Sequence, residues 1–330
     1  MDYATFLDEW RSDAPQVLVH TSGSTGKPKP IWVDKSRMRA SAQITCRFLG
    51  LQSGDTALLC LPVDYIAGKM MVVRSEECHL RLIAEEPSGH PLRHVSEPIT
   101  FAAMVPLQVF QSLQDPVEAA RLRAICHLII GGGAIDEHLE QMLVSFPHAV
   151  WSTYGMTETL SHIALRRVNG PEASLWYTPF DSVRVSLNAD QCLVIDAPRV
   201  CEQTLVTHDC AELRTDKMGR QQFRILGRID NVIDTGGIKV QIEEVEALLR
   251  PHLQAPFMIT RAADARLGEA IVLLTEDQQT EQVQQIAAET LPRYWQPRHI
   301  LTVDPLPMTA TGKPARAQAQ QLAHRLLAER

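Results

Sequence analysis

The amino-acid sequence predicts an α/β protein, with a large N-terminal domain of mainly parallel sheets and helices and a small α+β C-terminal domain. Three observations predict this class. Short apolar runs alternate with segments of helical periodicity through the first half of the chain, which is typical of a parallel sheet. Polar loops that contain glycine follow these runs, as at the carboxyl ends of parallel strands. From Asp181 onwards, short alternating stretches indicate half-buried strands.

The N-terminal elements follow from the spacing of their apolar residues. Residues 15–20 predict a strand that leads into the polar loop Thr21–Lys29. Residues 35–49 predict a helix, because apolar side chains recur there at helical spacing. Further buried strands are expected at 56–61, 125–130 and 150–154, and a further helix at about 136–144.

The C-terminal elements are shorter. Strands are expected at 183–187, 193–195 and 223–226. A helix at 242–249 should end before Pro251, because proline cannot continue it. Residues 256–330 predict a compact α+β unit. We place the domain boundary near Arg228–Asp230, so that the domains span residues 1–228 and 229–330.

Composition excludes several classes of protein. The 330 residues are 45% apolar and 22% charged, as in a soluble globular protein. The net charge of -7 argues against a nucleic-acid partner. No run of about 18 apolar residues predicts a membrane span, and the N-terminus does not resemble a secretory signal. The seven cysteines are scattered without a CxxC pair, which indicates neither a disulfide scaffold nor a zinc site, and we expect a cytoplasmic location.

The loop after the first strand has the composition of a polyphosphate site. Its small residues let backbone N–H groups approach an oxyanion, and its hydroxyls and lysines add donors and positive charge. It is not a Walker A loop, because Thr21 stands where that loop needs glycine and Pro28 where it needs Ser or Thr. The alternative is a flexible surface turn. The predicted ligand-binding residues are Thr21, Ser22, Gly23, Ser24, Thr25, Gly26, Lys27 and Lys29.

A second candidate motif is Tyr154-Gly-Met-Thr-Glu-Thr, at the end of a predicted strand. Glu158 could ligate Mg²⁺, which prefers oxygen ligands and substrate phosphates. Thr157 could donate a hydrogen bond to a phosphate. The alternative is an ordinary helix start, with Thr157 as its N-cap.

Two further candidates lie in the last third of the chain. Asp216, followed by Arg228, Asp230 and Gly236-Gly237, could bind ribose hydroxyls, although aspartates are also common in turns. Near the end, Leu306-Pro-Met-Thr-Ala-Thr-Gly-Lys-Pro presents Lys313 on an ordered loop. The alternative for that lysine is simple solvation.

Together, and in this order, the four motifs resemble those of the superfamily of acyl- and aryl-CoA synthetases, peptide-synthetase adenylation domains and luciferases. The resemblance extends from residue 17 to residue 313. It implies an adenylate-forming enzyme that uses ATP and Mg²⁺ to convert a carboxylic acid into an acyl-AMP. The chain is much shorter than is usual in this superfamily, so most of the usual N-terminal region is expected to be absent.

The resemblance also implies roles for individual residues. Thr21–Lys29 would hold the β- and γ-phosphates, and Asp216 would hold the ribose. Lys313 would bridge the carboxylate and the α-phosphate. The other implied contacts are Gly131, Gly132, Gly133 and Ala134 at the adenine and acyl pocket, Tyr154 and Gly155 near adenine, Thr157 at the α-phosphate, Glu158 on magnesium and Arg228 at ribose or phosphate.

A second half-reaction with CoA follows from the same resemblance. The C-terminal domain would rotate about Asp230 as a hinge, bringing Gly236 and Gly237 to the active site and removing Lys313. Relatives often have Gly-Gly-Glu-Asn where this chain has Gly236-Gly237-Ile-Lys239, which leaves the CoA contacts open.

Within the superfamily, the chain is most similar to compact o-succinylbenzoate–CoA ligases of menaquinone synthesis. The matching segments are residues 61–74, 157–166 and 227–233. The substrate's second carboxylate could pair with Lys69, Arg74 or His162, beside Tyr65 and Ser161. The alternatives are surface solvation for Lys69 and a packed position in a helix for His162.

Three other functions stay open at this point. The chain could be a ligase for another aryl or short acyl acid, an adenylation enzyme that loads a carrier protein, or a non-catalytic nucleotide-binding protein. The expected partners are a small carboxylic acid, ATP and CoA, with a homodimer as a possible assembly.

Overall fold

The computed structural model describes residues 2–20, 30–309 and 314–329. The chain divides into two compact units. The first comprises Met1–Ser186, Val194–Leu205 and Leu213–Arg224, and the second comprises Leu187–Leu193, Val206–Glu212 and Ile225–Arg330.

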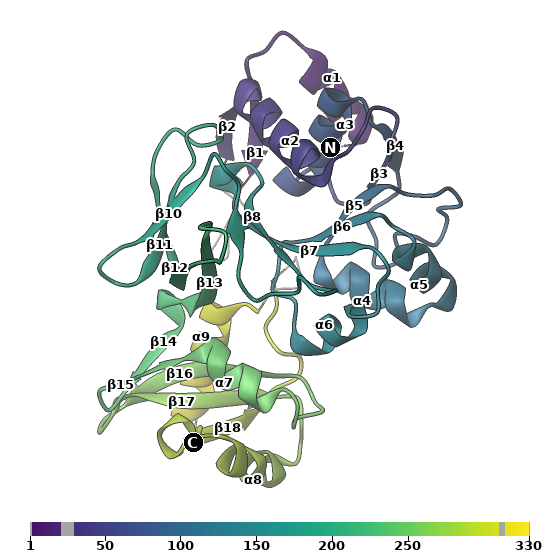
Figure 1. Cartoon of the computed structure of the whole chain (residues 1–330). Helices are drawn as coiled ribbons and strands as arrows, with labels where there is room; N and C mark the ends of the chain where they lie inside the picture. Colours follow the sequence, from purple (N-terminus) through teal and green to yellow (C-terminus); the bar gives the residue numbers. More distant parts are fainter. Residues whose placement is uncertain (1, 21–29, 310–313, 330) are drawn as a thin grey trace. The chain divides into compact units, whose positions relative to one another are not determined.

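A seven-stranded sheet forms the centre of the first unit, in the order β4-β3-β5-β6-β7-β8-β9 (Figure 1). Strands β4 through β7 are parallel to one another, and β8 and β9 are added antiparallel. The predicted α/β class with a mainly parallel sheet is therefore confirmed. The strands are β3 (Thr56–Leu59), β4 (Arg81–Ala84), β5 (Phe101–Met104), β6 (His127–Ile130), β7 (Ala149–Gly155), β8 (His162–Arg167) and β9 (Thr178–Pro179).

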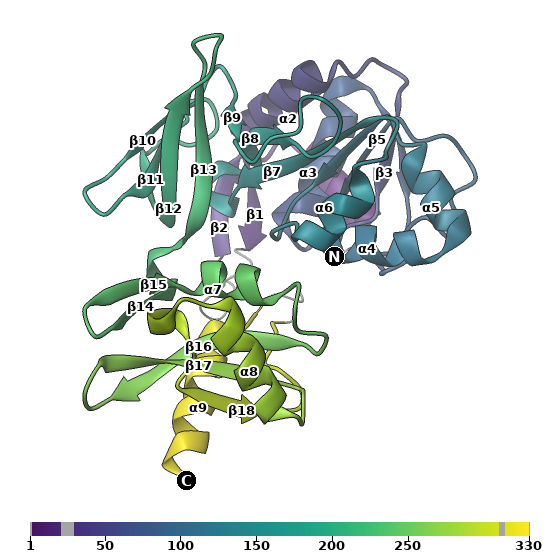
Figure 2. The same cartoon turned by 60° about the horizontal axis from the view of Figure 1, so that its bottom comes forward.

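Helices cover both faces of this sheet. Helices α1, α2 and α3 lie on one side and α4, α5 and α6 on the other (Figure 1 and Figure 2). A hydrophobic core lies between the sheet and helices α4, α5 and α6, and it includes Leu58, Leu122, Ile130 and Leu139. The helices are α1 (Tyr3–Arg11), α2 (Lys35–Leu49), α3 (Ile66–Cys78), α4 (Pro106–Gln114), α5 (Pro116–Arg123) and α6 (Glu137–Leu143), and a separate antiparallel pair consists of β1 (Gln16–His20) and β2 (Pro30–Asp34).

The second unit contains a five-stranded sheet, in the order β15-β14-β17-β16 with β18 added parallel to β17. Helices α7 and α8 pack against one core cluster, which includes Ile233 and Leu273, and α9 packs against another, which includes Val272 and Leu301. This confirms the α+β class of the C-terminal part. The elements are β14 (Val232–Thr235), β15 (Ile238–Gln241), α7 (Ile242–Leu249), β16 (Phe257–Asp264), β17 (Gly268–Thr275), α8 (Thr280–Thr290), β18 (His299–Thr302) and α9 (Arg316–Ala328).

A four-stranded sheet contributes residues to both units. Its order is β10 (Arg184–Leu187), β11 (Cys192–Asp196), β12 (Leu205–Thr215) and β13 (Gln221–Arg228). The sequence predicted three of these strands and missed β12. The continuous part of the second unit begins at Ile225, while the functional boundary at residues 228/229 stays a prediction.

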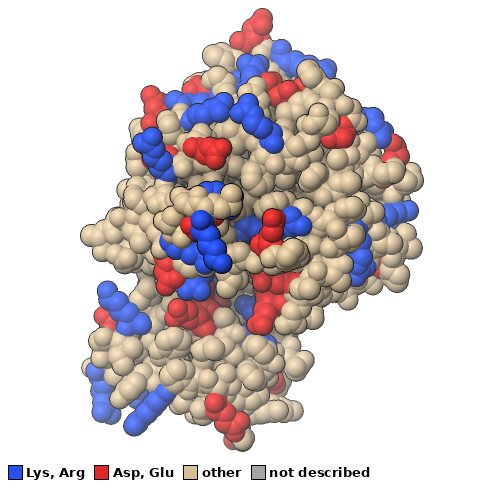
Figure 3. Space-filling view, viewed as in Figure 1, with Lys and Arg blue, Asp and Glu red and all other residues tan. Residues whose placement is uncertain are grey.

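The surface carries charges of both signs. Figure 3 shows Lys and Arg side chains interspersed with Asp and Glu over the face in view. Among the described residues, every helix is too short or too polar to cross a membrane.

Candidate active site

The ends of β6 and β7 bring two of the predicted motifs together. These strands are parallel neighbours, with Ile130 opposite Ser152, so the glycines after β6 lie beside the last residues of β7. A Cβ atom on Gly131 would lie 2.3 Å from Thr153 Oγ1, so any larger residue would displace the Thr153 side chain. The next residues, Gly132, Gly133 and Ala134, are exposed. The predicted adenine-site residues therefore share one edge of the sheet.

Tyr154 belongs to an aromatic cluster at this edge. Its ring meets that of Phe223 edge-on, with 5.1 Å between centroids, and lies 5.9 Å from the ring of Tyr177. Tyr177 in turn stacks on Phe223 at 5.5 Å and shares a hydrogen bond of 2.8 Å with Ser152 Oγ. Such pairs hold a ring in one orientation. Sequence reasoning missed Tyr177 and Phe223, because aromatic residues in distant strands give no local signal.

Thr157 and Glu158 lie in a short 3-10 helix, Thr157–Thr159, directly after β7. The alternative interpretation of Thr157 as an N-cap is wrong, because Met156 occupies that position and its N–H donates to Thr159 Oγ1. Leu160 then takes a left-handed conformation, with φ of 64°, which is strained for a residue with a side chain. Strained backbone of this kind is common at functional sites.

The donor set at this turn fits a magnesium ion better than a transition metal. Glu158 is exposed, and the described residues contain no group of three or more His, Cys, Asp or Glu side chains suited to a metal. Magnesium is usually held by one or two carboxylates together with substrate phosphates and water. A single accessible carboxylate is therefore sufficient for the predicted role.

Arg74 is a buried positive charge in the first unit. It lies on α3, is only 2% exposed, and makes a hydrogen bond to Ser161 Oγ. Its Nε atom is buried without a hydrogen-bond partner, and no carboxylate among the described residues pairs with it. Burial lowers the pKa of Arg74 to about 10, so the side chain still carries its charge at neutral pH. A buried charge that no opposite charge compensates costs several kcal/mol, so an anionic ligand that reached Arg74 would be favoured.

Ser161 and His162 extend this buried polar group. Ser161 Oγ lies 3.2 Å from His162 Nδ1, and His162 Nε2 lies 3.0 Å from Thr45 Oγ1. His162 begins β8, so the alternative that placed it in a helix is wrong. Burial, and then the charge of Arg74, hold the pKa of His162 well below its ordinary value. The imidazole is therefore neutral and acts through hydrogen bonds.

Lys69 and Tyr65 have other surroundings. Lys69 is 2% exposed, so the alternative of surface solvation is wrong. Its Nζ atom lies 4.1 Å from the centroid of the Phe6 ring, a cation–π contact with α1, and burial lowers its pKa. Tyr65 stands at the N-cap of α3 and forms an isolated β-bridge with His20 at the end of β1. Of the five predicted acyl-pocket residues, the structure thus joins Arg74, Ser161 and His162 by hydrogen bonds.

In the second unit, Arg228 lies between two aspartates. Its Nη2 atom lies 3.0 Å from Asp230 Oδ2, and its Nη1 atom lies 3.5 Å from Asp209 Oδ1. His208 Nδ1 approaches the same Oδ2 of Asp230 at 2.8 Å. Burial raises the pKa of Asp230, but hydrogen bonds from His208 and Arg228 outweigh this and leave it lowered. Sequence reasoning missed Asp209, because no local motif marks it.

Asp216 is engaged in its own turn. Its Oδ1 atom accepts the N–H groups of Met218 and Arg220, at 2.9 and 2.8 Å, and its Oδ2 atom accepts Arg220 Nε at 2.8 Å. Hydrogen bonding, led by the N–H of Arg220, lowers its pKa. This matches the alternative of a turn aspartate, and the acidic partners of Arg228 are Asp209 and Asp230 instead.

The remaining predicted residues divide into two groups. Gly236 and Gly237 form the turn between β14 and β15, with φ of 65° and 84°, and the N–H of Gly237 donates to Asp234 Oδ1 at 3.0 Å. The loop Thr21–Lys29 and Lys313 lie outside the described residues.

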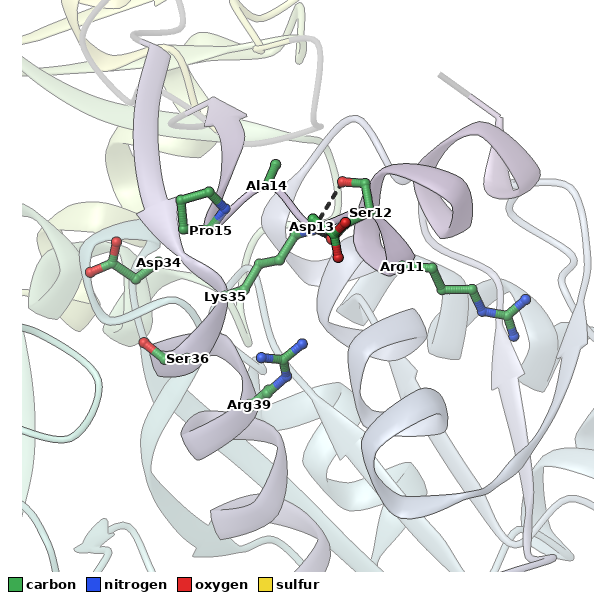
Figure 4. Close-up of a pocket in the computed structure, with 9 residues that line it drawn as sticks. All are labelled: Arg11, Ser12, Asp13, Ala14, Pro15, Asp34, Lys35, Ser36 and Arg39. Carbon is green, nitrogen blue, oxygen red and sulfur yellow. Dashed lines mark hydrogen bonds between the residues drawn. The ribbon is translucent and has the colours of Figure 1, made fainter.

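A polar pocket of about 430 Å³ lies between the end of α1 and the start of α2 (Figure 4). Its central side chain is Lys35, whose Nζ atom donates to the carbonyl oxygens of Glu9 and Ser12 at 2.8 and 2.7 Å. Lysine commonly satisfies the last carbonyls of a helix in this way. Lys35 therefore stabilises the end of α1 and needs no role in chemistry.

Comparison with known proteins assigns the family. A model of the family described as AMP-binding enzyme matches residues 5–196, more than half of the chain. The chain belongs to this family. As an AMP-binding enzyme of the adenylate-forming superfamily, it is 28% identical to a probable 2-succinylbenzoate–CoA ligase of Mycobacterium tuberculosis, over 94% of this chain and 85% of the relative.

Solved structures agree with this assignment. An acyl-CoA synthetase (AMP-forming)/AMP-acid ligase II-like protein from Dyadobacter fermentans is 32% identical, with a TM-score of 0.65, over 96% of this chain and 92% of that one. The o-succinylbenzoate CoA synthetase of Bacillus subtilis, solved with ATP and magnesium, has a TM-score of 0.75 at 22% identity. The match covers 92% of this chain and 69% of that one. The second match supports the fold alone.

Proposed function

We propose that this AMP-binding enzyme joins o-succinylbenzoate to CoA through an acyl-AMP intermediate, with ATP and Mg²⁺. In the first step, a carboxylate oxygen of the acid attacks the α-phosphorus of ATP and pyrophosphate leaves. In the second, the CoA thiolate attacks the acyl carbon and AMP leaves. The proposal rests on Arg74, a fully buried cation without a carboxylate partner among the described residues.

An acid with two carboxylates suits this arrangement. One carboxylate must react, while the other can neutralise Arg74 and accept its hydrogen bonds. A hydrogen bond to a charged group contributes about 1.5–3 kcal/mol. Ser161 holds the guanidinium from one side and His162 holds Ser161, so the cation is oriented before the ligand arrives. The resemblance to o-succinylbenzoate–CoA ligases supports the same substrate.

The residues that serve the nucleotide follow from the site and the resemblance. Glu158 supplies one oxygen ligand to magnesium, which neutralises charge on the phosphates. Thr157 donates to the α-phosphate, and Tyr154 packs beside adenine. Lys313 and Thr21–Lys29 supply the remaining positive charge and donors. For the ribose, Asp209 is a better candidate than Asp216, because Asp209 lies next to Arg228 while both oxygens of Asp216 bind its own turn.

Magnesium-dependent exchange of labelled pyrophosphate into ATP tests the proposal. We expect exchange with o-succinylbenzoate and little with benzoate or short fatty acids. Each monomethyl ester should be tested as well, because one ester blocks the reacting carboxylate and the other removes the partner of Arg74. Exchange with a monocarboxylic acid alone would support acid adenylation but contradict o-succinylbenzoate as the substrate. Silence across a broad panel of acids would favour a non-catalytic nucleotide-binding protein.

A further inference from the structure

Two thiols face each other in the four-stranded sheet, outside the residues assigned to the proposed reaction. Cys192 begins β11 and Cys210 lies within β12, the neighbouring strand. The N–H of Ala211 donates to the carbonyl oxygen of Gln191 at 3.0 Å, which puts Cys192 opposite Cys210. Their Sγ atoms are 4.0 Å apart.

The position of the two cysteines on neighbouring strands is compatible with the Cα spacing of a disulfide. Opposite residues on neighbouring strands have Cα atoms about 4.5–5.5 Å apart, within the range of about 4.4–6.8 Å found for disulfides. The sulfur atoms need to approach by about 2 Å to bond, which side-chain rotation can supply. We propose that Cys192 and Cys210 are a modification site, which forms an intramolecular disulfide by exchange with a low-molecular-weight disulfide such as oxidised glutathione.

The surroundings of the thiols fix the order of attack. Cys192 is 2% exposed, whereas Cys210 is partly exposed. Burial, followed by the neighbouring Cys210 and the carboxylates of Asp190 and Asp209, raises the pKa of Cys192 to about 11. Cys210 is therefore the thiol that meets the oxidant first, and Cys192 is the thiol that resolves the intermediate.

The exchange balances in two steps. The thiolate of Cys210 attacks one sulfur of oxidised glutathione, whose disulfide bond breaks and releases one glutathione thiolate. Cys192 then loses its proton and attacks the Cys210 sulfur, which releases the second glutathione. Two protein thiols are oxidised and one glutathione disulfide is reduced. The second step needs the Cys192 thiolate, so it should accelerate as the pH rises.

A metal site is a poorer interpretation of the same pair. Structural zinc needs four ligands, and the described residues contain no group of three or more candidate ligands. A disulfide needs only the two sulfurs. It would also restrain β12 where that strand carries His208 and Asp209, the residues that contact Asp230 and Arg228.

The test is incubation of the purified full-length chain with oxidised glutathione at mildly alkaline pH, followed by alkylation and mass spectrometry. We expect the intact mass, measured before alkylation, to be lower than that of the reduced chain by two hydrogen atoms. A peptide map of the alkylated protein should link Cys192 with Cys210. Dithiothreitol should reverse the link. Cys210→Ser should abolish it, whereas Cys126→Ser, at an exposed cysteine, should retain it.

Three outcomes would overturn the proposal: no link, a link between other cysteines, or a glutathione adduct on Cys210 that never resolves. If Cys210→Ser does not fold, Cys192→Ala serves as the second variant and should stop at the adduct. The melting temperature gives an independent readout, since the oxidised chain should melt higher than the reduced chain.

Discussion

At Arg74, a positive charge is buried beside hydroxyl and imidazole groups, with no carboxylate among its described neighbours. Arg74→Met removes this charge and keeps most of the volume. We expect kcat/KM for o-succinylbenzoate to fall by about 10- to 150-fold, which corresponds to about 1.5–3 kcal/mol. Rates with monocarboxylic acids should change little. Pyrophosphate release measures both.

Thermal unfolding of the same variant separates function from folding. Replacing a buried, uncompensated cation by an apolar side chain should leave the melting temperature unchanged or raise it. Arg93→Met, at an exposed arginine, is the matched control. Suppose instead that Arg74→Met lowers the melting temperature and leaves the preference for o-succinylbenzoate over monocarboxylic acids unchanged. Arg74 would then stabilise the folded chain and would not bind the substrate.

His162 should make stability depend on pH. Burial keeps its pKa well below the ordinary 6.5 in the folded chain, so below that pH the unfolded chain binds the proton and the folded chain does not. The free energy of unfolding should therefore fall as the pH drops below about 6.5, by at most about 1.4 kcal/mol per pH unit for this group. Above about pH 6.5, the free energy of unfolding should no longer depend on the titration of His162.

Urea unfolding across this pH range measures the dependence. His162→Gln removes the titrating group, so its stability should vary less with pH than that of the unmodified chain. His94→Gln, at an exposed histidine, should keep the original dependence. Equal dependence in all three proteins would contradict a neutral His162.

Among the elements, the junction of β7 and β8 leaves no room for a side chain at Gly155. A Cβ atom on Gly155 would lie 2.3 Å from the carbonyl oxygen of Ser161 and 2.5 Å from the Cα atom of His162. Gly155→Ala should lower the free energy of unfolding by about 1–3 kcal/mol, because backbone atoms must move. Gly133→Ala is the control for unfolding, since its Cβ would meet Pro106 at an ordinary 3.7 Å. Equal stability of the two variants in urea unfolding would show that the junction adapts.

The elements also show what sequence pattern can predict. Helix α2 was predicted with its observed bounds, because Met38, Ala42, Cys46 and Leu49 are all buried along one face. Helix α3 was missed, since Gly68–Ser75 is buried on every side and leaves no amphipathic period. Strand β12 was missed because only Thr207 and Ala211 are buried in it, so it lacks the regular alternation that predicts a half-buried strand.

The site was predictable only where one segment carries it. Tyr154–Thr159 is a local motif, and its position after a strand is as predicted. Tyr177, Phe223 and Asp209 reach their partners through sheet pairing, which a local pattern does not encode. Arg74 was found through family resemblance, and its burial without a carboxylate partner emerged only from the structure.

At the scale of the whole molecule, the proposed hinge at Asp230 would let the C-terminal domain rotate between acyl-AMP formation and thioester formation. Asp230 lies in a short 3-10 helix, Ile229–Asn231, and its carboxylate contacts Arg228 and His208. Asp230→Pro removes these contacts and fixes φ. We expect it to impair one half-reaction more than the other, when acyl-AMP formation and thioester formation from supplied acyl-AMP are measured separately. Asp230→Asn keeps the backbone freedom and should be milder. Equal turnover in both half-reactions of the proline variant would argue against a hinge here.

The central claim is that a carboxylate of the substrate attacks the α-phosphorus of ATP. The most direct measurement uses o-succinylbenzoate whose carboxylates carry ¹⁸O. The labelled acid is incubated with ATP, Mg²⁺ and CoA, and the masses of the products are determined by mass spectrometry. If the account is correct, AMP gains one labelled oxygen and pyrophosphate gains none. Label in inorganic phosphate, with ADP as the nucleotide product, would contradict it, because the acid would then have been activated at the γ-phosphorus.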